Sequence, residues 1–493
     1  MSSQPSPQPP VGIRLAGRSK AASVAPPGRL LVLAERIPIS LTPVLRDRRG
    51  VWIGWPGVTE DAPGAREVLA GGIQEGGFSL RPVPLTEGEK RKACAGFSGE
   101  VIGPLFHDMP QECNFDRSYW LAYRQVNRKF ARATARALSR AGGEDLVWVQ
   151  GHLLIHVAAE LRRLGVSART AFFLHVPFPA PDMFLKLPWR DRLFAALLAY
   201  RQVGFQTPRD LANFLSCVRV LLPGARITPR EDGLWTVRHA GGLDLQTGAF
   251  PVGIDIADVA ARIASPEVEK RAAGLRAQNH GCKLVLGIDP LERSRGIPEK
   301  LRAFAELLAR RPEIREKVCL VQIAVPSREC LPRHEALRAE VERMVGEING
   351  RFSRMGWTPV HYLRRALGRD ELLARLRAAD VALVTPLKAG MDLDAKEYCA
   401  ANLDEQGALV LSEFSGAATQ LGEAALTVNP YNAEATARAL WRALRMPEGE
   451  RTARMRALRA EVVRHDVSWW AGRFLAAALD EAPGEPAGLL GYL

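Results

Sequence analysis

The sequence predicts an α/β protein made of two doubly wound, Rossmann-like domains that face each other across a cleft. Two observations lead to this fold class. Short apolar runs that suit buried parallel strands alternate with segments of helical periodicity. The alternation starts near residue 29 and restarts near residue 283, so the 493 residues hold two units of similar size.

The first half contains four apolar runs that we expect to be strands. They are LLVLA just before Glu35, VWIGW at 51–55, DLVWVQ at 145–150 and TAFFLH at 170–175. Residues 118–143 and 153–165 have helical periodicity and end in glycine, which commonly stops a helix. Strand and helix at this spacing are typical of β–α–β units in a parallel sheet.

The second half repeats the alternation. The expected strands are 283–289, 317–326, 381–386 and 407–414, and the expected helices are 297–314, 335–352, 371–380 and 393–402. We place the domain boundary near 251–255. The expected parts are a Pro/Ser-rich disordered tail at 1–28, an N-terminal domain at 29–252, a C-terminal domain at 253–465, and a terminal helix and tail at 466–493.

The composition narrows the class of ligand. Hydrophobic residues make up 47% and charged residues 25% of the chain, which is an ordinary globular balance. The net charge of +13 favours an anionic partner. Because the basic residues are spread along the chain without a long Lys/Arg run, we expect a phosphorylated ligand and no nucleic acid. No apolar run reaches the roughly 18 residues of a membrane helix, so we expect no membrane partner.

The seven cysteines form no C-x-x-C pair, which predicts neither a zinc site nor a disulfide framework and favours a cytoplasmic location. The sequence also contains no P-loop, no G-x-S-x-G elbow and no H-E-x-x-H motif. We therefore expect no metal and no cofactor.

Candidate site residues follow the expected strands, because open α/β sheets bind ligands beyond the carboxyl ends of their strands. Gly390 precedes an expected helix, whose first N–H groups could bind an anion. Arg295 and Arg328 follow two expected strands and could bind phosphate. His175 ends another strand, and Glu397 could accept hydrogen bonds from ligand hydroxyls. The alternative for each residue is a purely structural role. The residues alone predict a cationic interdomain cleft for a phosphorylated or nucleotide ligand.

Many segments, in order, resemble the trehalose-6-phosphate synthase family, retaining glycosyltransferases of the GT-B fold. They include FFLHVPFPAPDMFLKLP (172–188), SRGIPEKLRAF (294–304), LVTPLKAGMDLDAKEY (383–398) and LVLSEFSGAATQLGEAALTVNPYN (409–432). The resemblance covers roughly residues 30–480. It implies transfer of a glucosyl-type unit, with retention and without metal, from a nucleotide sugar such as UDP-glucose to a phosphorylated sugar.

The resemblance also implies roles for single residues. Arg36 and Arg328 match arginines that bind the acceptor phosphate. His175 matches the histidine beside the donor sugar, and Arg295 stands where the family has the lysine that binds the donor diphosphate. These last two are the expected catalytic residues, because a leaving diphosphate without metal needs a cation and a helix N-terminus to stabilise its charge.

The donor side is expected to lie on the loop and helix near residue 390. Gly390, Met391 and Leu393 match the backbone loop that holds donor sugar and phosphate. Glu397 matches the glutamate that binds the nucleotide ribose.

Several matched positions depart from the family. Gly151 replaces an aspartate that contacts the acceptor sugar, and Pro290 replaces an arginine that binds the donor diphosphate. Ala389 replaces an aspartate, Asp392 an asparagine and Asp394 a valine. The four changes near the donor site together lower its charge by two relative to the family. On the acceptor side, the positions of a tyrosine and a tryptophan are also altered, and a glycine-rich loop is missing.

The departures leave two hypotheses open. The first is a glycosyltransferase of this family with an altered donor or acceptor. The second is a catalytically silent relative that acts as a regulatory or partner subunit of an active paralogue or within a homo-oligomer. Binding of a nucleotide sugar separates the two hypotheses.

Overall fold

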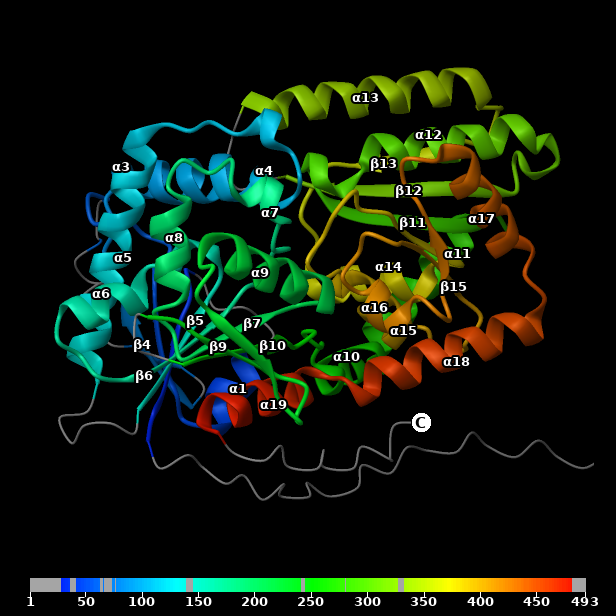
Figure 1. Cartoon of the computed structure of the whole chain (residues 1–493). Helices are drawn as coiled ribbons and strands as arrows, with labels where there is room; N and C mark the ends of the chain where they lie inside the picture. Colours follow the sequence, from blue (N-terminus) through cyan, green and yellow to red (C-terminus); the bar gives the residue numbers. More distant parts are fainter. Residues whose placement is uncertain are drawn as a thin grey trace, which may run out of the picture.

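The computed structural model describes residues 28–35, 41–62, 65, 73–75, 77–138, 145–240, 244–279, 281–326 and 332–480. Two β-sheets, rich in parallel pairs, lie side by side, each with helices packed against it (Figure 1). The predicted fold class of two Rossmann-like α/β domains is confirmed.

The N-terminal sheet has ten strands in the described part of the chain. In sheet order they are β3 (Ile73–Glu75), β4 (Phe78–Pro82), β2 (Val51–Gly54), β1 (Leu30–Leu33), β5 (Leu146–Gln150), β6 (Arg169–Phe173), β7 (Gln202–Phe205), β10 (Leu245–Ala249), β9 (Trp235–Arg238) and β8 (Arg226–Pro229). The pairs from β4 to β10 are parallel, and antiparallel pairs stand only at the two edges.

The C-terminal sheet is entirely parallel in its described strands. In sheet order they are β13 (Val360–Leu363), β12 (Val318–Val325), β11 (Lys283–Pro290), β14 (Val381–Val384), β15 (Ala408–Ser412) and β16 (Leu426–Val428). Apolar clusters cover both faces of this sheet, as expected for strands that read as continuous apolar runs.

The helices connect the strands and cover the sheets. Those of the N-terminal half are α1 (Thr42–Asp47), α3 (Glu87–Glu89), a π-helix (Lys90–Ile102), α4 (Gly103–Phe106), α5 (Arg117–Ala137), α6 (Val157–Arg163), α7 (Pro181–Phe184), α8 (Arg190–Leu197) and α9 (Pro208–Leu221). Those of the C-terminal half are α10 (Ile256–Ile263), α11 (Pro266–Gln278), α12 (Ile297–Arg310), α13 (Pro332–Phe352), α14 (Arg369–Ala378), α15 (Leu393–Ala401), α16 (Ala418–Leu421), α17 (Ala433–Arg445), α18 (Glu448–Arg464) and α19 (Val467–Leu479).

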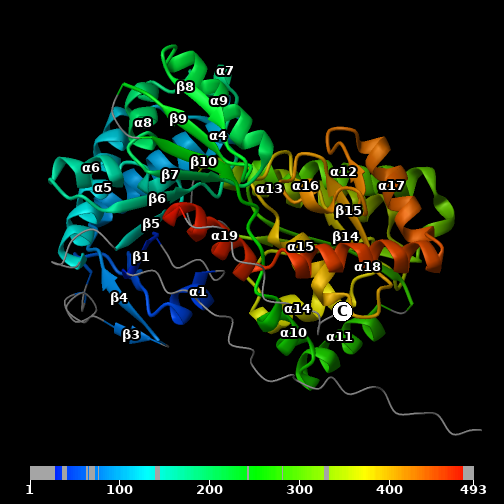
Figure 2. The same ribbon diagram turned by 60° about the horizontal axis from the view of Figure 1, so that its bottom comes forward.

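The last helix returns to the N-terminal sheet, a packing that the sequence left open. After α18 has followed the C-terminal domain, α19 lies beside α1 under the strands of the first sheet (Figures 1 and 2). The Phe474 ring stacks on Trp148 of β5 with centroids 4.9 Å apart. A Cβ at Gly204 of β7 would come within 2.5 Å of Phe474, so glycine permits this close approach. The C-terminal helix α19 thus ties the two domains together.

Two expected helices of the N-terminal half are shorter than predicted, for reasons of tertiary contact. The helix expected over 118–143 ends at Ala137, whose carbonyl accepts a 2.7 Å hydrogen bond from the Arg29 guanidinium. The helix expected over 153–165 begins only at Val157 and follows a 3₁₀ turn. Side chains of α5 bind the carbonyls of that turn, since Tyr123 donates to His152 and Asn127 to Leu153.

The π-helix at Lys90–Ile102 was not predicted. Its buried residues are at 93–94, 96–98 and 101–102. This spacing is close to the 3.6-residue period of an α-helix, so the sequence pattern does not mark the i to i+5 hydrogen bonding of a π-helix.

Candidate active site

A cavity of about 480 Å³ lies between the two domains. Glu35, which follows β1, and His152, which follows β5, line it from the N-terminal domain. Pro290, which ends β11, and Pro326, which follows β12, line it from the C-terminal domain. The cavity therefore stands at the carboxyl ends of both sheets, where ligands of open α/β sheets bind.

Two predicted residues, Arg36 and Arg328, lie outside the described residues. Their roles as ligands of the acceptor phosphate stay predictions. Glu35 directly precedes Arg36 and lines the cavity, and Pro326 lines it two positions before Arg328.

The described lining of the cavity does not have the cationic character that the sequence predicted. Three carboxylates, those of Glu35, Glu112 and Glu292, line the cavity together with two guanidinium groups, those of Arg293 and Arg333. Both arginines already have acceptors. Arg293 lies 3.0 Å from a carboxylate of α13 and 3.3 Å from one of α12. Arg333 donates to a carbonyl of the π-helix at 2.6 Å.

Three partly buried histidines, His107, His152 and His175, stand near the cavity, and desolvation lowers the pKa of each. The pKa of His152 falls to about 4, with a further contribution from His107, and that of His175 also falls to about 4. The pKa of His107 is lowered in the same direction. The His175 Nε2 atom lies 2.7 Å from the Gln150 side-chain oxygen. At neutral pH the imidazoles of His152 and His175 are therefore uncharged.

Gly390 and His175 meet across the two domains. A Cβ added at Gly390 would overlap the carbonyl oxygen of His175, and a Cβ added at Gly416 would overlap the carbonyl oxygen of Gly390. Only glycine allows this approach of three backbone segments. Next to it, Lys388 Nζ lies 2.6 Å from Asp108 Oδ2 of the N-terminal domain. The fold therefore brings together two residues that the sequence placed at one site.

Arg295 is held by the substituted residue Asp392. The Arg295 Nη1 atom lies 2.6 Å from Asp392 Oδ1, and the Ser415 hydroxyl donates to the other oxygen of Asp392. Burial works against the charge of Arg295, but Asp392 and other nearby carboxylates raise its pKa overall. The side chain of Asp392 makes no capping bond to α15, although it stands at the start of that helix. The N-terminal N–H groups of α15 are thus not capped by this side chain.

The other residues of the donor loop (387–392) and of the start of α15 differ in burial and in their charged neighbours. Met391 and Leu393 are partly buried and pack against apolar clusters of both domains. Glu397 is buried and accepts a 2.7 Å bond from Arg369. Burial raises the pKa of Glu397, while Arg369 opposes this rise. Burial and Glu397 raise the pKa of Asp394 to about 7, and Arg295 opposes this effect.

Sequence reasoning missed three partners at this site, namely Arg369, Ser415 and the Lys388–Asp108 pair. Each of them is far in sequence from the group that it contacts, and no local pattern marks such residues. Within the described residues, no three His, Cys, Asp or Glu side chains are grouped as a metal ion would require. None of the described helices is long and apolar enough to span a bilayer.

Two Rossmann-like domains, joined by a returning C-terminal helix and enclosing a cavity at the carboxyl ends of both sheets, define the class of GT-B glycosyltransferases. Comparison with known proteins identifies the family. The model of glycosyltransferase family 20 matches residues 35–480. The chain belongs to glycosyltransferase family 20, which confirms the resemblance seen in the sequence.

Relatives match over nearly the whole chain. The trehalose-6-phosphate synthase of Mycolicibacterium gilvum (strain PYR-GCK) is 40% identical, over 94% of this chain and 97% of its own length. That of Mycobacterium leprae (strain TN) is 42% identical, over 91% and 89%.

Solved structures of similar proteins contain ligands. The α,α-trehalose-phosphate synthase (UDP-forming) of Burkholderia xenovorans, in complex with glucose-6-phosphate, has a TM-score of 0.85 and 33% identity, covering 92% of this chain and 100% of its own. A structure from E. coli bound with UDP-2-fluoro glucose has a TM-score of 0.85 and 34% identity, covering 93% and 100%.

Proposed function

We propose that this chain is a retaining hexosyltransferase that moves a glucosyl-type unit from a nucleotide sugar to a phosphorylated sugar. The observation that carries this proposal is the cavity at the carboxyl ends of both sheets, next to the meeting point of His175 and Gly390. Relatives that share the fold carry glucose-6-phosphate or a UDP sugar, which supports the two substrate classes.

On the donor side, the chain would stabilise the leaving diphosphate with fixed charges and dipoles. Arg295 supplies a cation that keeps its charge at any physiological pH. The N-terminus of α15 supplies backbone donors and a positive dipole end. Neutral His175 would hydrogen-bond the transferred sugar, and Glu397 would accept hydrogen bonds from the ribose. Preorganised groups of this kind lower the barrier because they stabilise charge that develops only in the transition state.

On the acceptor side, Arg36 and Arg328 would bind the phosphate of the incoming sugar. Cys94 and Gly103 line the cavity. These positions carry a tyrosine and a tryptophan in the family, so the contacts to the acceptor sugar differ here. We therefore include an altered acceptor in the proposal. The acceptor would attack from the face of the leaving group, which gives retention without a covalent carboxylate.

The hypothesis of a catalytically silent partner is not favoured, because the relatives that match this chain over most of its length are named as synthases. Association with a paralogue or with a second copy stays a prediction.

Calorimetric titration with UDP-glucose, GDP-glucose and UDP, each with and without glucose-6-phosphate, tests the proposal. We expect saturable binding of at least one nucleotide sugar at micromolar to low millimolar concentration. The absence of heat with every nucleotide at millimolar concentration would contradict it. When variants of the site are titrated in the same way, Arg343→Ala is a suitable control, because this exposed arginine on α13 pairs only with Glu347 in the described structure.

A further inference from the structure

The cations near the donor loop are already matched by carboxylates. In the described part of the chain, the pairs are Arg295 with Asp392, Arg293 with Glu340, Arg369 with Glu397, Lys388 with Asp108 and Lys300 with Asp289. A nucleotide diphosphate that enters this region therefore meets cations that each have an anionic partner.

In the Arg295–Asp392 pair, the carboxylate is buried and both of its oxygens accept hydrogen bonds. Asp392 is only 5% exposed, and its second oxygen accepts a hydrogen bond from the Ser415 hydroxyl. Arg295, in contrast, has 26% of its side chain exposed. Asp392 thus fixes one edge of the guanidinium from the protein interior, at the position where an incoming phosphate would have to compete.

Further carboxylates add to the negative charge around this pair. Asp289 forms an ion pair with Lys300 at 2.5 Å and accepts a hydrogen bond from the Gln322 amide at 2.9 Å. Asp394 has no hydrogen-bond or ion-pair partner within the described residues, and Glu292 lines the adjoining cavity. The region thus has more carboxylate than Arg295 alone can offset.

We propose that Asp392 is an internal counter-ion that competes with the donor diphosphate for Arg295 and thereby weakens donor binding. This inference rests on the proposed function, which places the diphosphate at Arg295. A charge-assisted bond between guanidinium and carboxylate must be weakened before the phosphate gains its own, and the displaced carboxylate stays buried beside a second anion. The affinity for the donor therefore depends on how easily its phosphate replaces the Asp392 carboxylate at Arg295.

An asparagine at 392 would keep the shape and remove the charge. Its amide oxygen could still accept a hydrogen bond from Arg295 or Ser415, but it would not repel a phosphate. We expect Asp392→Asn to bind UDP about tenfold more tightly than the wild-type chain, which corresponds to ~1.4 kcal/mol. Uridine lacks phosphate and should bind both proteins alike, whereas a general rearrangement of the site would change both affinities.

The test is calorimetric titration of the full chain with UDP and, by competition, with uridine. The control is Asp404→Asn, which removes the same charge from an exposed loop of the same domain and should leave the Kd of UDP unchanged within about twofold. A Kd for UDP that is unchanged or higher in Asp392→Asn overturns the inference while the proposed function stands. Failure of UDP to bind wild type and variant alike overturns both. If Asp392→Asn does not fold, Asp392→Ser carries the same expectation.

Discussion

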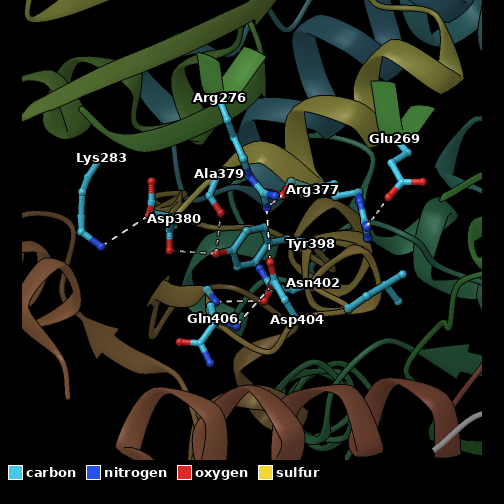
Figure 3. Close-up of polar contacts among 12 residues, drawn as sticks. Glu269, Arg276, Lys283, Arg377, Ala379, Asp380, Tyr398, Asn402, Asp404 and Gln406 are labelled. Carbon is cyan, nitrogen blue, oxygen red and sulfur yellow. Dashed lines mark hydrogen bonds and ion pairs between the residues drawn. The ribbon is translucent and has the colours of Figure 1, made fainter. Parts of the chain in front are cut away.

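The two ends of the C-terminal sheet differ in how their polar groups are matched. At the amino end, Asp380 accepts a 2.8 Å hydrogen bond from the Leu284 N–H and faces Lys283 at 3.4 Å (Figure 3). The Tyr398 hydroxyl donates to the Asp380 carbonyl at 3.1 Å, and Asn402 accepts from the Gly407 N–H at 2.9 Å. These bonds join the strand starts to α15 and to the loop that follows it.

At the carboxyl end of the sheet, the charged groups are less completely paired. Arg295 faces several carboxylates, and desolvation of the partly buried Asp394, together with the nearby Glu397, raises the pKa of Asp394 to about 7. A region that only held the fold together would gain nothing from such unmatched groups, and perturbed titration is typical of functional sites. The comparison indicates that the amino end stabilises the domain and the carboxyl end is the place of the chemistry.

The largest effect that would sharpen this comparison is expected at Arg295. Arg295→Ala removes the cation nearest the predicted diphosphate and should lower kcat/KM for hexosyl transfer by roughly 10²–10³-fold. Steady-state kinetics of UDP release measures this loss. Arg343→Ala should keep wild-type kinetics, and equal activity of the two variants would break the assignment of the donor site.

Gly390→Ala should have the next largest effect. The added Cβ would overlap the carbonyl of His175 and force the two domains apart at their contact. Overpacking of this kind costs about 1–3 kcal/mol, so we expect kcat/KM to fall about 5- to 150-fold. Gly274→Ala on α11 is the matched control, since nothing lies within 4 Å of its added Cβ. Unchanged kinetics of Gly390→Ala would show that this contact does not position the donor loop.

The pH dependence of stability tests the unmatched group Asp394. Its pKa of about 7 exceeds the usual value of 3.8, so the folded state keeps a proton that the unfolded state has lost between those values. The free energy of unfolding therefore falls as pH rises from about 4 to about 7, by at most ~1.4 kcal/mol per pH unit. Denaturant unfolding at pH 5 and pH 8 should show a smaller difference for Asp394→Asn than for the wild-type chain. An identical difference in both would mean that Asp394 titrates normally.

The smallest effect is expected at the amino end. Tyr398→Phe leaves the carbonyl of Asp380 without its 3.1 Å donor and should lower the free energy of unfolding by about 1 kcal/mol. Its kcat/KM should stay at the wild-type value. Tyr362→Phe is the control, because the Tyr362 hydroxyl has no hydrogen-bond partner within the described residues. A large loss of activity in Tyr398→Phe would break the division between the two ends.

The sequence predicted the parts of the fold that depend on local pattern. The strand expected at 317–326 is β12 at Val318–Val325, because a strand buried on both faces reads as one apolar run. The end of α5 was not predicted, because the Arg29 guanidinium, far away in the sequence, binds the carbonyl of Ala137. The π-helix was not predicted, because its buried residues repeat at a spacing close to that of an α-helix.

At the site, too, some features could be predicted from the sequence and others could not. The rule for strand carboxyl ends, with the family resemblance, selected His175 and Gly390, and the fold brings them together. The resemblance placed Arg295 and Asp392 at one site, but the bonds of Asp392 to Arg295 and Ser415 could not be predicted, because Asp392 is 97 residues from Arg295 and 23 from Ser415 along the chain. Only the order of the strands in the folded sheet makes them neighbours.

The central claim is that the interdomain cavity performs retaining hexosyl transfer. The most direct test is to incubate the purified chain with UDP-glucose and a panel of sugar phosphates that includes glucose-6-phosphate, and to follow the anomeric protons by NMR. The account predicts release of UDP together with a new α-linked, phosphorylated disaccharide. UDP-glucose that stays intact with every acceptor, or a β-linked product, would contradict it.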